Sequence, residues 1–169
     1  MLRGLVHWVM SIGQRRQGWL DERMHAGVRE LLVHACARHW LACPAYCLMP
    51  DHGHFLWLGL CETSDQLPAA RFFRTHWNRL LDSRGVELEK QGYEHVLIEH
   101  ERNRSEFEDA MFYILRNPED AGLVAGWREW PHLGSIAAGF PDIDPRDRQR
   151  FPGNFWKIHH QQVRKLAGG

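Results

Sequence analysis

Four short stretches of the chain are predominantly apolar. Residues 5–12, 42–49, 54–60 and 94–99 are rich in apolar, aromatic and β-branched residues, which is typical of β-strands. The second and third stretches flank a polar corner, "PDHG", so they predict a hairpin of two strands. We expect these strands to pair into an antiparallel sheet.

Between these stretches, apolar residues recur at the three- and four-residue spacing of an amphipathic helix. This spacing predicts helices over residues 21–40, 67–82 and 105–116, with Asp21 and Ser105 as N-terminal caps. Pro118 ends the third pattern, and a last short amphipathic helix is expected near residues 154–166.

The order of the predicted elements is strand, helix, strand, strand, helix, strand, helix. This order predicts an α+β fold, in which an antiparallel sheet of four to five strands has helices packed on one face and leaves the other face for a ligand. A length of 169 residues with 44% hydrophobic residues suits one domain. We expect that domain to be residues 1–138, followed by a C-terminal tail, residues 139–169, with a short helix.

Composition narrows the class of protein. There is no uncharged apolar run of about 18 residues, so a membrane span is excluded. The amino terminus has no signal-peptide cleavage site, and the four cysteines form no CxxC pair, so we expect a cytoplasmic protein with reduced thiols. The net charge of zero gives no support for a nucleic-acid partner. Charge is nevertheless segregated along the sequence. Residues 67–84 carry four basic and one acidic side chain, whereas residues 87–109 carry three basic and eight acidic side chains.

Two histidines lie one residue apart in the segment "YCLMPDHGHFLWLGL". On a strand, His52 and His54 point to one face and Gly53 to the other, so the two imidazoles could bind a metal ion or could be held by hydrogen bonds in the core. In "FYILRNP", Tyr113 and Asn117 stand four residues apart and share one helix face. A phenol and an amide beside two imidazoles would place a nucleophile next to a divalent metal ion with three protein ligands.

The segments "MPDHGHFLWL" and "YILRNPEDAGLV" resemble the two motifs of the HUH single-tyrosine transposases. The likeness is greatest to the REP-associated tyrosine transposases, which are related to the transposases of small bacterial insertion sequences. It extends to the first strand, the basic second helix and the segment "WREWPHLGS", so it covers most of residues 5–136.

The resemblance implies a ferredoxin-like, RRM-like HUH fold, with residues 1–138 as the catalytic domain. His52, His54 and Asn117 would bind Mg²⁺ or Mn²⁺, and Tyr113 would be the nucleophile. The implied activity is cleavage and rejoining of single-stranded DNA at hairpins of palindromic repeats (REP elements), through a 5′-phosphotyrosine intermediate. The ligand types themselves would also admit zinc or nickel.

Four arginines are candidates for binding DNA phosphates. Arg15 and Arg16 follow the first predicted strand, and Arg71 and Arg74 lie on the second predicted helix. A solvated helix surface is the alternative interpretation of the latter pair. We expect hairpin or single-stranded DNA as the partner, no membrane, and a monomer or homodimer.

Two other functions stay open. Gly53 stands where the resembling family has a bulky apolar residue, and Glu99 and Glu101 lie where it commonly has a basic one. These differences favour the alternative of a catalytically impaired hairpin-DNA-binding module of the same fold. A metal-dependent phosphodiesterase that uses water in place of Tyr113 is a further hypothesis.

Overall fold

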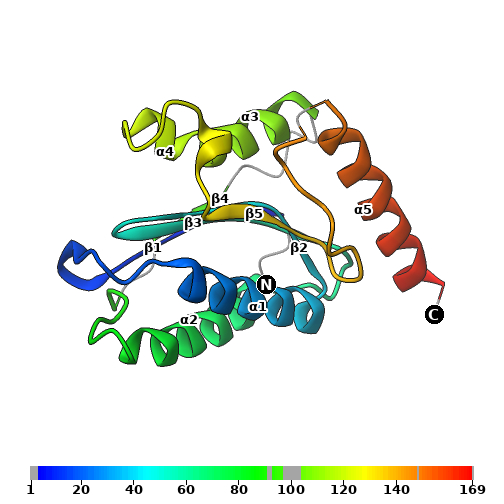
Figure 1. The fold of residues 1–169 in the computed structure, drawn as a ribbon. Coiled ribbons are helices and arrows are strands. Elements are labelled where there is room, and N and C mark those ends of the chain that lie inside the picture. Colours follow the sequence, from blue (N-terminus) through cyan, green and yellow to red (C-terminus); the bar gives the residue numbers. More distant parts are fainter. Residues whose placement is uncertain (1–3, 91–92, 97–103, 148, 169) are drawn as a thin grey trace.

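The structure is a computed structural model, and it describes residues 4–90, 93–96, 104–147 and 149–168. Its centre is a five-stranded sheet with the order β4-β1-β3-β2-β5, and all four strand pairs are antiparallel (Figure 1). The strands are β1 (Leu5–Ser11), β2 (Leu41–Met49), β3 (His52–Gly59), β4 (Tyr93–Val96) and β5 (Leu133–Ile136). The predicted hairpin is therefore β2 and β3, and the central strand β3 carries both motif histidines.

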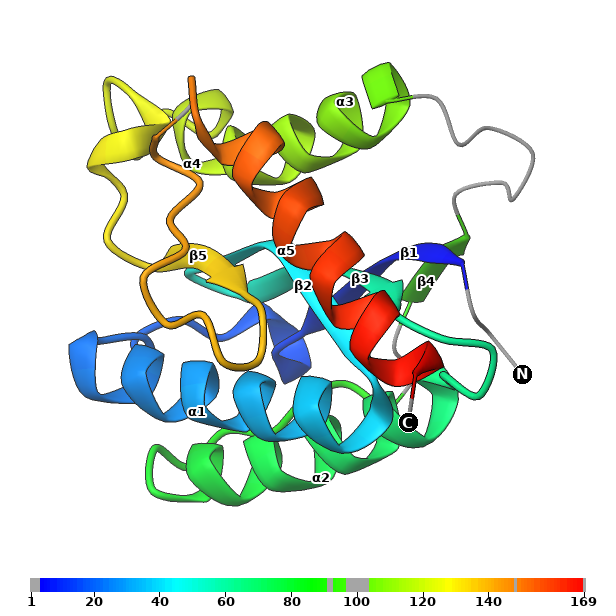
Figure 2. The same ribbon diagram turned by 90° about the vertical axis from the view of Figure 1, so that its right-hand side faces the viewer.

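Helices cover both faces of this sheet (Figures 1 and 2). On one face lie α1 (Glu22–His39) and α2 (Gln66–Asp82), side by side. On the opposite side lie α3 (Arg104–Leu115), the short α4 (Asn117–Asp120) and α5 (Phe151–Ala167). Two 3-10 turns, η1 (Gly13–Arg15) and η2 (Trp127–Glu129), complete the described elements.

The predicted fold class, an α+β fold with an antiparallel sheet, is confirmed. The expectation that helices pack on one face alone needs correction, because α3 and α5 cover part of the second face. The physical reason is that both helices carry apolar stripes of their own: Phe107 and Met111 of α3, and Phe151 and Phe155 of α5, are all buried. The last helix has 17 residues and is longer than predicted.

Local signals explain where the first two helices begin. The Asp21 side chain accepts a hydrogen bond from the backbone N–H of Met24 at 2.8 Å, as the sequence predicts. The Asp65 side chain caps α2 in the same way through the N–H of Leu67. At the other end, α1 stops at Trp40, whose backbone is left-handed with φ of 54°.

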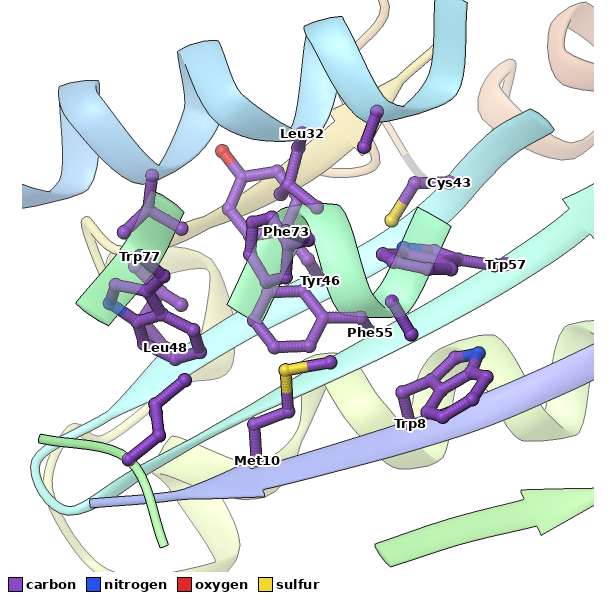
Figure 3. Packing of buried hydrophobic residues seen from close by; sticks show 14 of the residues in the cluster. Trp8, Met10, Leu32, Cys43, Tyr46, Leu48, Phe55, Trp57, Phe73 and Trp77 are labelled. Carbon is purple, nitrogen blue, oxygen red and sulfur yellow. The ribbon is translucent and has the colours of Figure 1, made fainter. Parts of the chain in front are cut away.

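The first hydrophobic core lies between the sheet and α1 and α2, and we call it the α1–α2 core (Figure 3). Its centre is aromatic: the ring centroids of Phe55 and Trp77 are 5.6 Å apart, and those of Phe55 and Phe73 are 5.0 Å apart, both edge to face. Trp8 of β1 packs against Trp57 of β3 beside them. This core holds β1 and β3 in place from the face of the sheet that carries α1 and α2.

The second core, the α3–α5 core, lies on the opposite face. Phe107 of α3 stacks on Phe155 of α5 with centroids 5.3 Å apart, and Leu56 of β3 belongs to the same cluster. Phe151 and Phe155 come from the predicted C-terminal tail, so the tail contributes to the core. Among the described residues, no helix is long and apolar enough to cross a bilayer.

Candidate functional site

The two motif histidines point away from the α1–α2 core. Gly53, between them, faces that core: a Cβ atom built on it would lie 2.8 Å from the ring of Phe55 and 3.0 Å from the ring of Trp77. His52 and His54 therefore project toward the side of the sheet that carries α3, as the strand alternation predicts. The rings of Phe55 and Trp77 fill the space that a larger side chain at position 53 would occupy.

The two imidazoles belong to a series of close polar contacts on the face of the sheet where β1 and β3 pair. Nε2 of His52 lies 2.9 Å from Nε2 of His54. On the far side of each ring, Nδ1 of His52 lies 2.6 Å from a carboxylate oxygen of Asp51, and Nδ1 of His54 lies 2.9 Å from Nε2 of His7. Both nitrogens of both motif histidines thus have a partner.

His7 is a further residue of this corner and lies outside the two sequence motifs. It lies on β1, whose burial alternates so that Val6, Trp8 and Met10 enter the α1–α2 core. The same alternation sends His7 to the face of His54, and this pattern in "LVHWVMS" was the available signal.

His54 is strongly shifted toward the neutral form. Its pKa is lowered from 6.5 to about 3, first because burial disfavours the charged imidazole and then because His52, His7 and Arg15 lie nearby. The neighbouring Asn117 side chain acts in the opposite direction and raises this pKa. A neutral His54 keeps a lone pair on its ring for a hydrogen bond or a metal ion.

Tyr113 and Asn117 lie above these histidines, at the junction of α3 and α4. The Tyr113 side chain is 60% exposed, and its ring meets the ring of His7 edge to face with centroids 6.1 Å apart. The amide nitrogen of Asn117 donates to the carbonyls of Tyr113 and Ile114 at 2.9 and 3.2 Å, so the helix end fixes this side chain next to His54. All four predicted site residues therefore meet in one corner of the fold.

The corner suits a divalent metal ion in its ligand types and in its spacing. Ligands about 2.1 Å from an octahedral ion lie about 3 Å apart when adjacent, and the two Nε2 atoms are 2.9 Å apart. Among the described residues no three His, Cys, Asp or Glu side chains are arranged to hold a metal. The third histidine of the corner, His7, lies against Nδ1 of His54, whereas His52 lies against Nε2 of His54. The protein donors here are two imidazoles and the Asn117 amide.

Of the four predicted phosphate-binding arginines, the structure brings one to this corner. The guanidinium of Arg15 lies 3.6 Å from the Asp51 carboxylate and 3.4 Å from the Ser11 hydroxyl. Arg15 and the preceding Gln14 both have positive φ, 54° and 56°, an unusual conformation for residues other than glycine. The neighbouring Arg16 donates to the carbonyl of Gly85 at 2.8 Å.

Arg71 and Arg74 are not part of the same corner. They lie on α2, which packs through Phe73 and Trp77 on the face of the sheet opposite to the histidines. Arg74 donates to the carbonyls of Glu89 and Lys90, and partial burial lowers its pKa. Their contact with DNA stays a prediction.

Glu99 and Glu101, the two acidic positions noted in the sequence, lie outside the described residues.

An open pocket of about 610 Å³ borders α3. Its lining includes Phe112, which precedes Tyr113 in the sequence, and Arg116. Its carboxylates, from Asp109, Glu119 and Glu129, outnumber its guanidiniums, from Arg116 and Arg128, so its charge does not favour a phosphate.

No protein-family model matches the chain, and no curated protein matches it significantly. Among solved structures it is similar to a REP-associated tyrosine transposase bound to a REP hairpin, with 18% identity, a TM-score of 0.66, and coverage of 79% of this chain and 77% of that one. It also matches a candidate transposase from Deinococcus radiodurans R1, at 16% identity and a TM-score of 0.47 over 67% of this chain and 92% of that one. The chain thus has the fold of the first of these structures.

Proposed function

We propose that this protein is a transposase-like enzyme that binds hairpin-containing single-stranded DNA, and cleaves and rejoins it through Tyr113. The observation that carries the proposal is the meeting of a phenol, two imidazoles and an amide at one corner, through His54 and His7. The hairpin is suggested by the similar solved structure, which is bound to one.

Tyr113 is the nucleophile in this proposal. Tyr113 is 60% exposed, so a DNA strand can approach it from solvent. The phenol oxygen forms a bond to phosphorus while the bond from phosphorus to the 3′ oxygen breaks, and in net balance the phenol proton ends on the released 3′-hydroxyl. The downstream DNA is then joined to Tyr113 through its 5′ phosphate.

The neighbouring side chains prepare the phosphate for this step. His52, His54 and Asn117 would hold Mg²⁺ or Mn²⁺, which when bound supplies charge neutralisation and orientation of the scissile phosphate. Arg15 adds positive charge at the same corner, 3.6 Å from Asp51. His7 supports the Tyr113 ring through their edge-to-face contact.

Rejoining follows from the chemistry of the intermediate. A phenolate is a better leaving group than an alkoxide, so a 3′-hydroxyl can attack the phosphotyrosine and release Tyr113 without ATP. The enzyme can therefore transfer a strand to a different 3′ end as well as restore the original one.

Trapping of a covalent adduct tests this proposal. Hairpin oligonucleotides with single-stranded flanks, labelled at the 3′ end, are incubated with the protein and Mn²⁺ and separated under denaturing conditions. Wild-type protein should become labelled, and Tyr113→Phe should not. Tyr46→Phe is the matched control, because it removes a phenol hydroxyl that hydrogen-bonds with His25 and Arg29 on the opposite side of the sheet.

Other outcomes identify the alternatives. Salt-sensitive hairpin binding without adduct, with Mg²⁺, Mn²⁺, Zn²⁺ or Ni²⁺, would indicate a binding module without turnover. Cleavage that survives Tyr113→Phe and is lost in His52→Ala would indicate a water-dependent phosphodiesterase. An adduct in Tyr113→Phe would contradict the assignment of the nucleophile.

A further inference from the structure

We propose that Asp51 and His7 are positioning residues that set which nitrogen of His52 and of His54 carries a proton, so that both Nε2 lone pairs can turn to one ion. The inference rests on the proposed function, which assigns an ion to the histidine pair. It follows from the positions of the ring protons along the series of contacts that joins Asp51, His52, His54 and His7.

His52 is fixed by Asp51. A neutral imidazole has one N–H and one lone pair, whereas a carboxylate only accepts hydrogen bonds. Because Nδ1 of His52 lies 2.6 Å from the Asp51 carboxylate, Nδ1 must carry the proton. Nε2 of His52 is therefore a lone pair, and it faces His54.

His54 then has two possible arrangements, and His7 permits both. Without an ion, the 2.9 Å contact between the two Nε2 atoms requires the proton of His54 on Nε2, and Nδ1 of His54 then accepts from Nε2–H of His7. With an ion, His54 needs its proton on Nδ1. His7 can accept that hydrogen bond when its own proton is on Nδ1.

The change between these arrangements adds and removes no proton: His54 and His7 each move one from Nε2 to Nδ1. Metal ligands of this type usually donate their second ring N–H to an oriented acceptor, and Asp51 and His7 stand at those two positions. The contact of His7 with Tyr113 also places the same imidazole beside the proposed nucleophile.

The first test measures Mn²⁺ affinity of the full chain by titration calorimetry without DNA. His7→Phe keeps a ring but removes the acceptor, so affinity should fall by about 10- to 100-fold. His7→Gln offers an amide oxygen to Nδ1–H of His54 and should recover most of the loss. His34→Phe, at an exposed position on α1, is the matched control and should bind like wild type.

Asp51 is tested in the same titration. Asp51→Asn keeps an oxygen acceptor for Nδ1–H of His52 and should bind Mn²⁺ better than Asp51→Leu, which keeps none. Urea unfolding of each variant verifies that it is folded. Equal affinities of wild type, His7→Phe and Asp51→Leu would overturn the inference.

Nitrogen-15 NMR of the imidazoles reads the proton positions directly. On saturation with Mg²⁺, the His54 proton should move from Nε2 to Nδ1 in wild type, and this shift should be missing in His7→Phe. A His54 ring that keeps its proton on Nε2 with the ion bound would overturn the inference.

The outcomes separate this inference from the proposed function. Wild-type protein that binds Mn²⁺ no better than His52→Ala would overturn the inference. If that protein still formed an adduct through Tyr113 in the presence of chelator, the assignment of Tyr113 as the nucleophile would be supported. Loss of affinity in His7→Phe without any adduct in wild type would support the inference and contradict the proposed catalysis.

Discussion

The two faces of the sheet are built from the same strands and have opposite chemistry. On β3, Phe55 and Trp57 enter the α1–α2 core, while His54 between Gly53 and Phe55 faces the other way. One face is covered by aromatic rings, and the other is apolar beneath α3 and α5 but polar around His52 and His54. Because successive residues of a strand point to opposite faces, the aromatic core on one face supports the histidines on the other.

This difference assigns different tasks to neighbouring residues. The α1–α2 core packs Phe55 of β3 against Phe73 and Trp77 of α2, and aromatic contacts of this kind contribute strongly to the free energy of unfolding. The histidine corner contributes polar contacts whose value lies in their geometry. Substitutions on the two faces should therefore separate stability from chemistry.

Trp77→Ala should have the largest effect on stability. Trp77 is fully buried and contacts Phe55 and Phe73, so its loss should lower the free energy of unfolding by about 3–5 kcal/mol. Urea denaturation measures this change. Tyr113→Ala, at a site 60% exposed, should cost within about 0.5 kcal/mol, and a comparable loss in both variants would refute the division between the faces.

Gly53→Val should destabilise by about 1–3 kcal/mol, because its side chain would overlap the rings of Phe55 and Trp77. Urea unfolding again supplies the measurement. Gly53→Ala should follow the same direction with a smaller effect. A more stable Gly53→Val protein would mean that space is available behind the histidine pair.

Acid should destabilise the metal-free protein through buried neutral histidines. The pKa of His54 is lowered to about 3 and that of His25 to about 4, both mainly by burial, so the unfolded chain binds more protons below pH 6.5. Stability is then complete above about pH 6.5 and declines as the pH falls toward 4. Urea midpoints across this range should fall less steeply for His54→Asn than for wild type. Parallel curves would exclude His54 as a source of the acid effect.

Arg15→Ala and Arg71→Ala should differ slightly but measurably in hairpin binding. Arg15 lies at the histidine corner and Arg71 lies on α2 across the sheet. Loss of one phosphate contact should reduce the dependence of log affinity on log salt by about one unit in Arg15→Ala. Arg71→Ala, on the opposite face of the sheet from the proposed cleavage site, should reduce this dependence by less. The reverse result would place the DNA on the α2 face.

Local periodicity was sufficient to predict much of the fold and the site. The hairpin and the shared face of His52 and His54 follow from the spacing of two residues. Tyr113 and Asn117 were expected on one helix, but α3 ends at Leu115 and Asn117 begins α4, so the two residues lie on successive helices. The cap at Asp21 follows from a local hydrogen bond.

Other features depend on contacts between distant parts of the chain. An apolar stripe shows that a helix is buried but does not say on which face, so the second layer of helices was not predicted. The lack of space for a side chain at Gly53 depends on Trp77 of α2. The hydrogen bond of the Arg74 guanidinium depends on the backbone carbonyl of Glu89. His7 had a signal in the strand alternation, but its partner His54 lies 47 residues away.

Anomalous diffraction at the manganese edge, from crystals grown with Mn²⁺, tests the metal site most directly. We expect one strong peak between Nε2 of His52 and Nε2 of His54, with the Asn117 amide oxygen as the third protein ligand. A peak elsewhere in the molecule, or two imidazoles still hydrogen-bonded to each other at saturating Mn²⁺, would contradict the central claim that this corner holds a metal ion.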